Sequence, residues 1–280
     1  MPAKGRIDTA ICLPFAAARS PEGSPDVIGR VQTMLVRPAL VTLALVGLWQ
    51  IVVAVWQVPP FMLPGPLRVL AALAARPGFW WENALVTSFE ALCGLLAGSL
   101  AGGALALGIV RFPAAGRFLL PTIVVSQALP VFAIAPLLVL WLGFGFGSKI
   151  VMATIAIFFP VAAAFHDGLR ATDGGLLDLG RLYGASPGDR LLLLQVPSAL
   201  PSLASGLRLA AVYAPIGALV GEWVGASSGL GYVMLQANAR SQTDVVFAAL
   251  LIVAVLAVAL RAAVDSLTKR LVFWAPDSSN

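Results

Sequence analysis

Long uncharged apolar stretches, separated by short clusters of charge and proline, dominate the pattern of hydrophobic and polar positions. Crossing a bilayer takes about 20 predominantly apolar residues, and the pattern predicts six spans, at residues 38–56, 91–110, 118–148, 150–165, 201–223 and 245–260. The second span is expected to extend past Glu90 toward the N-terminus. Four prolines within residues 59–66 end the first span, because proline lacks an amide donor and fixes φ. The third stretch is predicted to be one kinked span, followed by a turn at residues 143–147, because it contains Pro121, Pro130 and Pro136.

Composition agrees with this pattern. Hydrophobic residues make up 59% of the chain and charged residues 11%, and the mean hydropathy is +0.92. A soluble domain has about 45–50% apolar and about 25% charged residues, so a soluble globular domain is excluded, and so is intrinsic disorder. The chain is predicted to be an all-α polytopic membrane protein with about six transmembrane helices. Its net charge of +5 fits basic cytoplasmic loops rather than nucleic-acid binding.

The distribution of Lys and Arg predicts the orientation. With both termini in the cytoplasm, thirteen of these residues fall on inner segments, and the outer segments hold Arg68, Arg76, Lys149 and Arg240. Because basic residues concentrate in cytoplasmic loops, both termini are predicted to be cytoplasmic.

The first 36 residues are expected to form a cytoplasmic extension, and residues 276–280 a C-terminal tail. Lys4 and Arg6 precede an apolar run at residues 11–18, which superficially resembles a cleavable signal peptide. That run is short and contains Pro14, so the extension is the preferred interpretation.

A few polar residues fall in or near the apolar spans. Ionisable groups are costly there and face protein or water, so Glu90, Arg208 and Glu222 are candidates for lining a solute path, as is Gln127 beside a proline kink. Arg208 could instead pair with a carboxylate, and Glu222 could lie at the outer interface beside Trp223. Gly94, Gly98 and Gly102 predict close helix packing, within the subunit or, less favoured, between subunits.

The sequence offers little material for catalysis or metal binding. It has one histidine, His166, at the edge of a span, and two cysteines, Cys12 and Cys93. It contains neither a Walker A sequence nor an H-E-x-x-H motif. We therefore expect no catalytic residues, no metal site and no cofactor in this chain.

The segment between the fourth and fifth spans, residues 167–200, carries the clearest local pattern. Leucines spaced by three and four around residues 176–183 predict a short amphipathic helix, with Gly184 just after its end. Ser186, Pro187 and Asp189 then match an N-cap, N1 and N3, which predicts a second short helix running to about Gln195. Two short helices joined by a tight turn could transmit motion from a soluble partner to the fifth span. The alternative is a simple connector on the membrane surface.

Residues 178–201 resemble the cytoplasmic EAA loop of binding-protein-dependent ABC importer permeases. Asp178-Leu179-Gly180 stands at the EAA position, Gly184 follows after three residues, and Leu194 and Val196-Pro197 take the Ile and Leu-Pro places. Asp replaces Glu and Gly replaces the second Ala, but the spacing is kept. The resemblance implies that a separate ATPase subunit contacts Asp178, Gly184, Ala185, Ser186, Pro187 and Pro197.

Residues 85–275 are similar to permeases of the nitrate/sulfonate/taurine group, in segments such as SQALPVFAIAPLLVLWLGFG (126–145) and APIGALVGEWVGASSGLGYVM (214–234). More narrowly, FHDGLR, PIGALVGEW and LQANARSQTD resemble permeases for uptake of a thiamine pyrimidine precursor of the hydroxymethylpyrimidine type.

The resemblance implies an inner-membrane permease domain at residues 37–275, which includes the coupling loop at 167–200. Its implied partners are a cytoplasmic ATP-binding subunit, a second permease subunit in a homodimer, a periplasmic or lipid-anchored solute-binding protein, and membrane lipid. The expected solute is a pyrimidine precursor, or alternatively a sulfonate, taurine or nitrate. A self-powered secondary carrier and a membrane-embedded enzyme are the rival classes.

Overall fold

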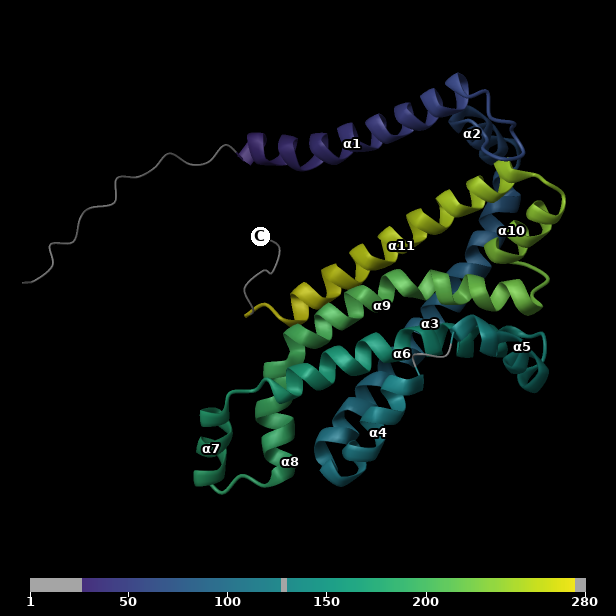
Figure 1. Cartoon of the computed structure of the whole chain (residues 1–280). Coiled ribbons are helices and arrows are strands. Elements are labelled where there is room, and N and C mark those ends of the chain that lie inside the picture. Colours follow the sequence, from purple (N-terminus) through teal and green to yellow (C-terminus); the bar gives the residue numbers. More distant parts are fainter. Residues whose placement is uncertain (1–26, 127–129, 275–280) are drawn as a thin grey trace, which may run out of the picture. The chain divides into compact units, whose positions relative to one another are not determined.

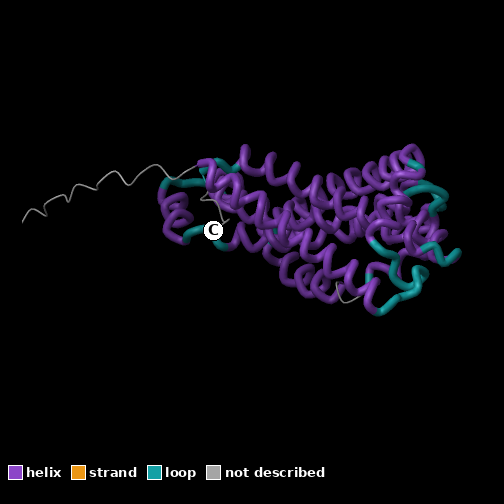
Figure 2. The backbone as a smooth tube through the Cα atoms, turned by 90° about the horizontal axis from the view of Figure 1, so that it is seen from above, coloured by secondary structure: helices purple, strands orange, loops and turns teal. Residues whose placement is uncertain are grey.

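The computed structural model describes residues 27–126 and 130–274, and within them the chain is helical and contains no strand (Figures 1 and 2). The all-α prediction is therefore confirmed. The elements are α1 (Val27–Val55), α2 (Pro66–Ala75), α3 (Pro77–Arg111), α4 (Pro113–Ser126), α5 (Val131–Leu142), α6 (Phe146–Arg170), α7 (Gly174–Leu182), α8 (Pro187–Asp189), the π-helix η1 (Arg190–Gln195), α9 (Val196–Gly225), α10 (Leu230–Ala239) and α11 (Thr243–Leu271).

The chain divides into two compact units, residues 1–51 and 52–280. In the first, the described chain is α1 up to Ile51. Helix α1 ends at Val55 and the following residues, 56–65, are turns and irregular backbone. This confirms the predicted break at the proline-rich segment.

In the second unit, α6 lies between α3 and α9 and packs against both along their lengths (Figure 1). The core they share consists largely of alanine and other small or branched side chains: Ala91, Leu95, Ala153, Ile157, Val161, Ala210, Ala211, Ala214, Ala218 and Leu260. Small residues let helix backbones approach closely, which is how helices associate in lipid.

The glycine stripe of α3 is part of this packing. A Cβ added at Gly102 would lie 2.6 Å from the carbonyl oxygen of Phe158 and 3.0 Å from the amide nitrogen of Ala162, both in α6. Gly98 likewise faces Ile157, and Gly94 faces Ala153. The favoured interpretation, packing within one subunit, is therefore confirmed.

Four helical segments of the described chain are long and apolar enough to cross a membrane: α3, α6, the segment Pro187–Gly225, and α11. Helix α3 begins at Pro77, well before Glu90, as predicted, and α11 continues past Arg261 to Leu271. The other two expected spans correspond to α1 and to the stretch at residues 118–148.

The structure describes two helices, α4 and α5, in the stretch predicted to be one kinked span; residues 127–129 between them lie outside the described residues, and the single span stays a prediction. The stretch contains two helices, α4 of 14 residues and α5 of 12 residues. At 1.5 Å per residue each is about 20 Å long, which is short of a bilayer core. Pro130 directly precedes α5, and Gly143, with φ of +78°, ends it.

Replacing Gly102 by alanine is expected to lower the midpoint of thermal unfolding of the purified protein. The new Cβ meets backbone atoms of α6, which cannot move aside as a side chain can, and overpacking of this kind costs about 1–3 kcal/mol. The matched control is Gly103→Ala, because a Cβ at Gly103 has no atom within 4 Å. Alanine at Gly103 should keep or raise the midpoint, since it improves helix propensity. An equal loss in both variants would contradict the packing explanation.

Candidate functional site

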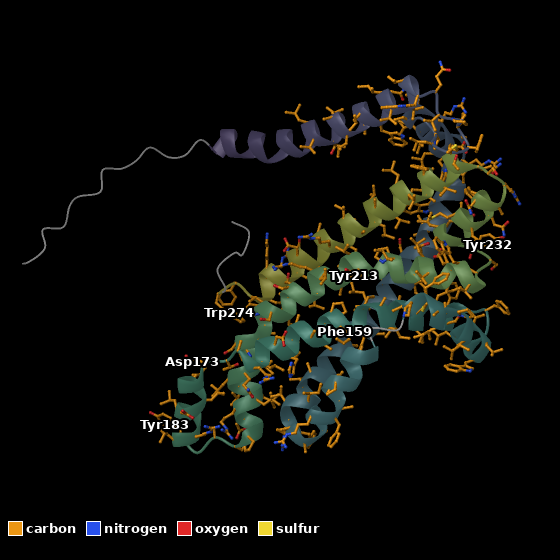
Figure 3. The ribbon with its side chains drawn as sticks, in the orientation of Figure 1. Phe159, Asp173, Tyr183, Tyr213, Tyr232 and Trp274 are labelled. Carbon is orange, nitrogen blue, oxygen red and sulfur yellow. The ribbon has the colours of Figure 1, made fainter. Side chains whose placement is uncertain are left out.

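Helix α7 forms the first half of the predicted coupling loop and is capped at both ends (Figure 3 labels Asp173 and Tyr183, which flank it). The Asp173 carboxylate accepts a hydrogen bond from the Leu176 amide at 3.1 Å. At the other end Gly184 has φ of +74°, its amide donates to the Arg181 carbonyl, and the Ala185 amide donates to the Gly180 carbonyl at 2.9 Å. This is a Schellman motif, which confirms the predicted helix and its glycine stop.

The second half of the loop begins with a capping box. The Asp189 amide donates to Ser186 Oγ at 3.2 Å, and the Asp189 carboxylate accepts from the Ser186 amide at 3.2 Å and from Ser186 Oγ at 2.6 Å. Pro187 occupies the first helical position, where no amide donor is needed. The N-cap, N1 and N3 assignments are confirmed.

The second short helix was expected to end at about Gln195, before Pro197. In the structure it continues past Pro197. Helices α8, η1 and α9 form one continuous segment from Pro187 to Gly225. Pro197 and Pro201 lack amide donors, so regular i to i−4 bonding cannot run through the start of α9. The preceding turn widens into the π-helix η1, in which the Val196 amide bonds to the Leu191 carbonyl. The coupling turn is thus joined directly to α9.

The loop is anchored on one side and exposed on the other. Leu191 of η1 is buried in a cluster with Ala106 of α3, Phe165 and Leu169 of α6, and Ala199 of α9. Helix α7 buries no residue, and Leu182 and Tyr183 at its end are 85% and 84% exposed. Exposed apolar patches are typical of surfaces that bind a partner. We call the exposed turn at residues 182–189 the coupling turn.

Most predicted coupling residues lie on or beside the coupling turn. Asp178, one turn earlier, is exposed and pairs with Arg181 at 2.6 Å. Gly184, Ala185, Ser186 and Pro187 form the turn itself, whereas Pro197 lies in the first turn of α9. Gly180 stands where the EAA pattern has its second alanine. The packing is close at this position, since a Cβ there would lie 2.9 Å from Leu194 Cδ1.

A buried polar cluster lies at the other end of α9, where α9 turns into α10. Glu222 is 1% exposed, so it does not lie exposed at an interface beside Trp223. Its carboxylate accepts hydrogen bonds from the amides of Gly231, at 2.5 Å, and Tyr232. It also accepts from Thr87 Oγ1 at 2.6 Å. Glu222 therefore caps the N-terminus of α10 from the preceding helix.

Two side chains of α3 complete this cap. The Gly229 amide donates to Asn83 Oδ1 at 2.8 Å, and the Leu230 amide donates to Thr87 Oγ1 at 2.9 Å. The amides of the N-cap residue Gly229 and of the first three residues of α10 are thus all bonded to buried side chains of other helices, which satisfies the orphan donors of a buried helix start. Gly229 has φ of +106°, and a Cβ there would overlap the Glu222 carboxyl group. The turn can approach Glu222 only because this residue is glycine.

Lys149 holds the carbonyl side of the same turn. It is 4% exposed, and its Nζ donates to the carbonyl oxygens of Gly225, at 2.8 Å, Phe144, at 2.6 Å, and Gly145, at 3.0 Å. Gly225 is the last residue of α9, so Lys149 satisfies an orphan carbonyl there. The count of outer charges included Lys149 as a loop residue, and the structure corrects this.

Glu90 also belongs to this cluster and is 1% exposed. Its side chain neighbours Glu222 and Lys149 within the cluster. Both Glu222 oxygens accept hydrogen bonds, from Thr87 Oγ1 and from the Gly231 amide. Oε2 of Glu90 has no hydrogen-bond partner among the described residues.

The four pathway candidates do not form one group. Glu90 and Glu222 meet in the buried cluster, whereas Arg208 pairs with Asp265 of α11 at 2.7 Å, the carboxylate pairing that the sequence analysis left open. Arg208 precedes Glu222 by 14 positions in α9, which corresponds to about 21 Å. Gln127 lies outside the described residues. The role of these residues in a solute path stays a prediction.

Asn83, Thr87 and Lys149 were missed by the sequence analysis. The signal that could have found two of them is periodicity, because Asn83, Thr87 and Glu90 follow at intervals of four and three within an apolar helix. Lys149 gives no such signal. A single charge at the start of a span is equally compatible with an exposed loop residue and with a buried helical one. Among the described residues no group of three or more His, Cys, Asp or Glu could hold a metal ion.

Comparison with known proteins gives consistent matches. The family model described as binding-protein-dependent transport system inner membrane component matches residues 94–273. A probable ABC transporter permease protein of Haemophilus influenzae is 47% identical, covering 85% of this chain and 98% of its own. The formylaminopyrimidine transport permease protein ThiX of Halalkalibacterium halodurans is 33% identical, with coverages of 85% and 95%.

A taurine transport system permease protein, TauC of Escherichia coli, is 30% identical, covering 82% of this chain and 86% of its own. Among solved structures, an inward-facing MetNI methionine ABC transporter aligns with a TM-score of 0.55 at 21% identity. The alignment covers 68% of this chain and 93% of that one. The last likeness supports the fold alone.

Glu222→Gln is expected to destabilise the purified protein by about 1–3 kcal/mol, because the amide NH2 must face a donor, either the Thr87 hydroxyl or the α10 amides. Glu90→Gln is the matched control. Oε2 of Glu90 has no hydrogen-bond partner among the described residues, so the effect of this variant should stay below about 1 kcal/mol. Chemical unfolding in detergent measures both. Equal losses, or a larger loss in the Glu90 variant, would contradict the capping role of Glu222.

Proposed function

Because the chain belongs to the family of binding-protein-dependent transport system inner membrane components, we propose that two copies of it form the solute pathway of an ATP-driven importer. Proteins of this family are non-catalytic ABC importer permeases of the inner membrane, and a separate subunit hydrolyses ATP. The observation that carries the proposal is the coupling turn, which combines rigid caps, exposed Leu182 and Tyr183 and a continuous connection to α9.

The coupling turn suits the transmission of motion. A short segment holds its shape under load only if its backbone groups are bonded locally, and the Schellman motif and the capping box provide those bonds. A displacement at Ser186 reaches α9 through η1 without an intervening loop. Leu191 conveys the same displacement to α6, because it packs on Phe165 and Leu169. Closure of the ATPase subunits would thereby move α6 and α9 together.

For the transported solute we propose a pyrimidine precursor of thiamine. The 33% identity with the formylaminopyrimidine permease ThiX supports this choice, as do the segments FHDGLR and LQANARSQTD. The alternative is a sulfonate, taurine or nitrate, which the 30% identity with the taurine permease TauC favours. A periplasmic or lipid-anchored binding protein would deliver either solute to the end of α9 opposite the coupling turn. With the coupling turn on the cytoplasmic side, we propose that both termini are cytoplasmic too, as the distribution of Lys and Arg predicts.

The importer proposal predicts that an ATPase subunit co-purifies with the protein from its native membranes and that Leu182→Asp disrupts the complex. A charge in place of this 85% exposed leucine would be desolvated without a partner in the interface. The matched control is Phe273→Asp, which changes an 82% exposed aromatic residue after α11. Wild-type protein that purifies without ATPase activity, yet transports solute in vesicles, would instead favour the self-powered secondary carrier.

Gly184→Val is expected to reduce ATP-driven uptake by the reconstituted complex at least fivefold while leaving membrane insertion intact. Its φ of +74° is strongly disfavoured for a β-branched residue. The substitution tests backbone strain and not a steric clash, because no atom lies within 4 Å of a Cβ added at Gly184. Asparagine tolerates this region of φ, so Gly184→Asn should retain most uptake. Uptake that is equal in the valine and asparagine variants would contradict the role of this turn.

A further inference from the structure

A cavity of about 440 Å³ opens at the end of α9 that lies opposite the coupling turn. Residues of α2, the start of α3, α10 and the start of α11 line this open cavity, and Figure 3 labels one of them, Tyr232. Its volume falls within the range of small-molecule sites, about 300–1,000 Å³. The side chains that give it chemical character are Arg76, Trp80, Tyr232, Gln236, Arg240 and Asp244.

The walls of this cavity are fixed by hydrogen bonds. Trp80 Nε1 donates to the Ala72 carbonyl at 3.0 Å, which ties α3 to α2. Thr243 Oγ1 at the start of α11 donates to the Pro60 carbonyl at 2.6 Å. Helix α10 is held by the buried cap around Glu222. The cavity is therefore preformed, and a ligand would not have to order it.

Three of its polar side chains, those of Arg76, Gln236 and Arg240, offer donors without a partner among the described residues. Tyr232, Gln236 and Arg240 follow at intervals of four along α10, so they project into one side of the cavity. Within the described residues neither Arg76 nor Arg240 has a carboxylate at ion-pair distance, and the Gln236 amide has no hydrogen-bond partner. Two free guanidinium groups in the lining of one cavity are suited to binding an oxyanion, because each offers several N–H donors in a plane.

We propose that this cavity binds a small ligand carrying a sulfonate, phosphate or carboxylate group. Arg76 and Arg240 would hold the oxyanion, and Trp80 and Tyr232 would cover the apolar part of the ligand. Asp244 adds a carboxylate, which suits a ligand that also carries an amine. The oxyanion has two sources: a free organic anion in transit, or the headgroup of an anionic phospholipid at the membrane surface. Only the first source rests on the proposed importer function.

The test uses the full-length permease in nanodiscs of phosphatidylcholine, titrated calorimetrically with taurine and with ethanesulfonate, which lacks the amine. A second set of nanodiscs contains phosphatidylglycerol, and native mass spectrometry counts the lipid molecules retained. The variants are Arg76→Gln, Arg240→Gln, their combination, and Asp244→Asn. Arg261→Gln, an exposed arginine of α11 outside the cavity, is the control. Unfolding midpoints establish that each variant is folded, and the single variants serve if the double variant is not.

We expect at least one probe to bind and the double arginine variant to weaken it tenfold or more. Arg261→Gln should bind as wild type does. Taurine binding that Asp244→Asn weakens, with ethanesulfonate binding unchanged, identifies a free amine-bearing anion. Retention of phosphatidylglycerol that the double variant loses identifies the lipid. Binding that is unchanged in the double variant, or that neither sulfonate nor phosphatidylglycerol shows, would overturn the proposal. Absence of an ATPase partner overturns the importer function alone, since these titrations require only the permease.

Discussion

The rest of the structure depends on one constraint, the need to satisfy backbone polar groups where a helix ends inside the protein. Buried groups of this kind are shut off from water, so each orphan amide and carbonyl needs a protein partner. The turn from α9 to α10 meets this need with a carboxylate from Glu222, a hydroxyl and an amide from α3, and an ammonium group from Lys149. Four helices are thereby tied to one point, and their relative positions follow from it.

Between this point and the coupling turn, small residues carry the packing. The glycines and alanines of α3 and α9 bring their backbones against α6, so that relative sliding would meet carbonyl oxygens rather than mobile side chains. Dense interiors transmit displacement because they compress little. On the proposed function, α3, α6 and α9 would therefore move as one rigid group, with the capped turn at residues 182–189 at one end and the capped start of α10 at the other.

The sequence predicted the parts of this arrangement that depend on local rules. Hydropathy located the spans, and the order Gly184, Ser186, Pro187, Asp189 predicted both caps, because capping involves neighbours within a few residues. It did not predict the cap of α10, since Asn83 and Thr87 reach it across about 140 positions of sequence. Nor did it predict the joining of η1 to α9. Two prolines there read as a break, whereas a wider turn accommodates them.

That wider turn has a consequence for the evolution of the loop. The hydrogen bonds of a π-helical turn span five positions instead of four, and η1 lies between the exposed turn at residues 182–189 and α9. Removing one residue from 190–195 would take away the wider turn that accommodates Pro197 and Pro201. It would also turn everything before it by about 100° around the axis of α9. Insertions and deletions at this site thus act as angular adjustments, through which a lineage of such proteins could re-aim its docking face without altering a single contact residue.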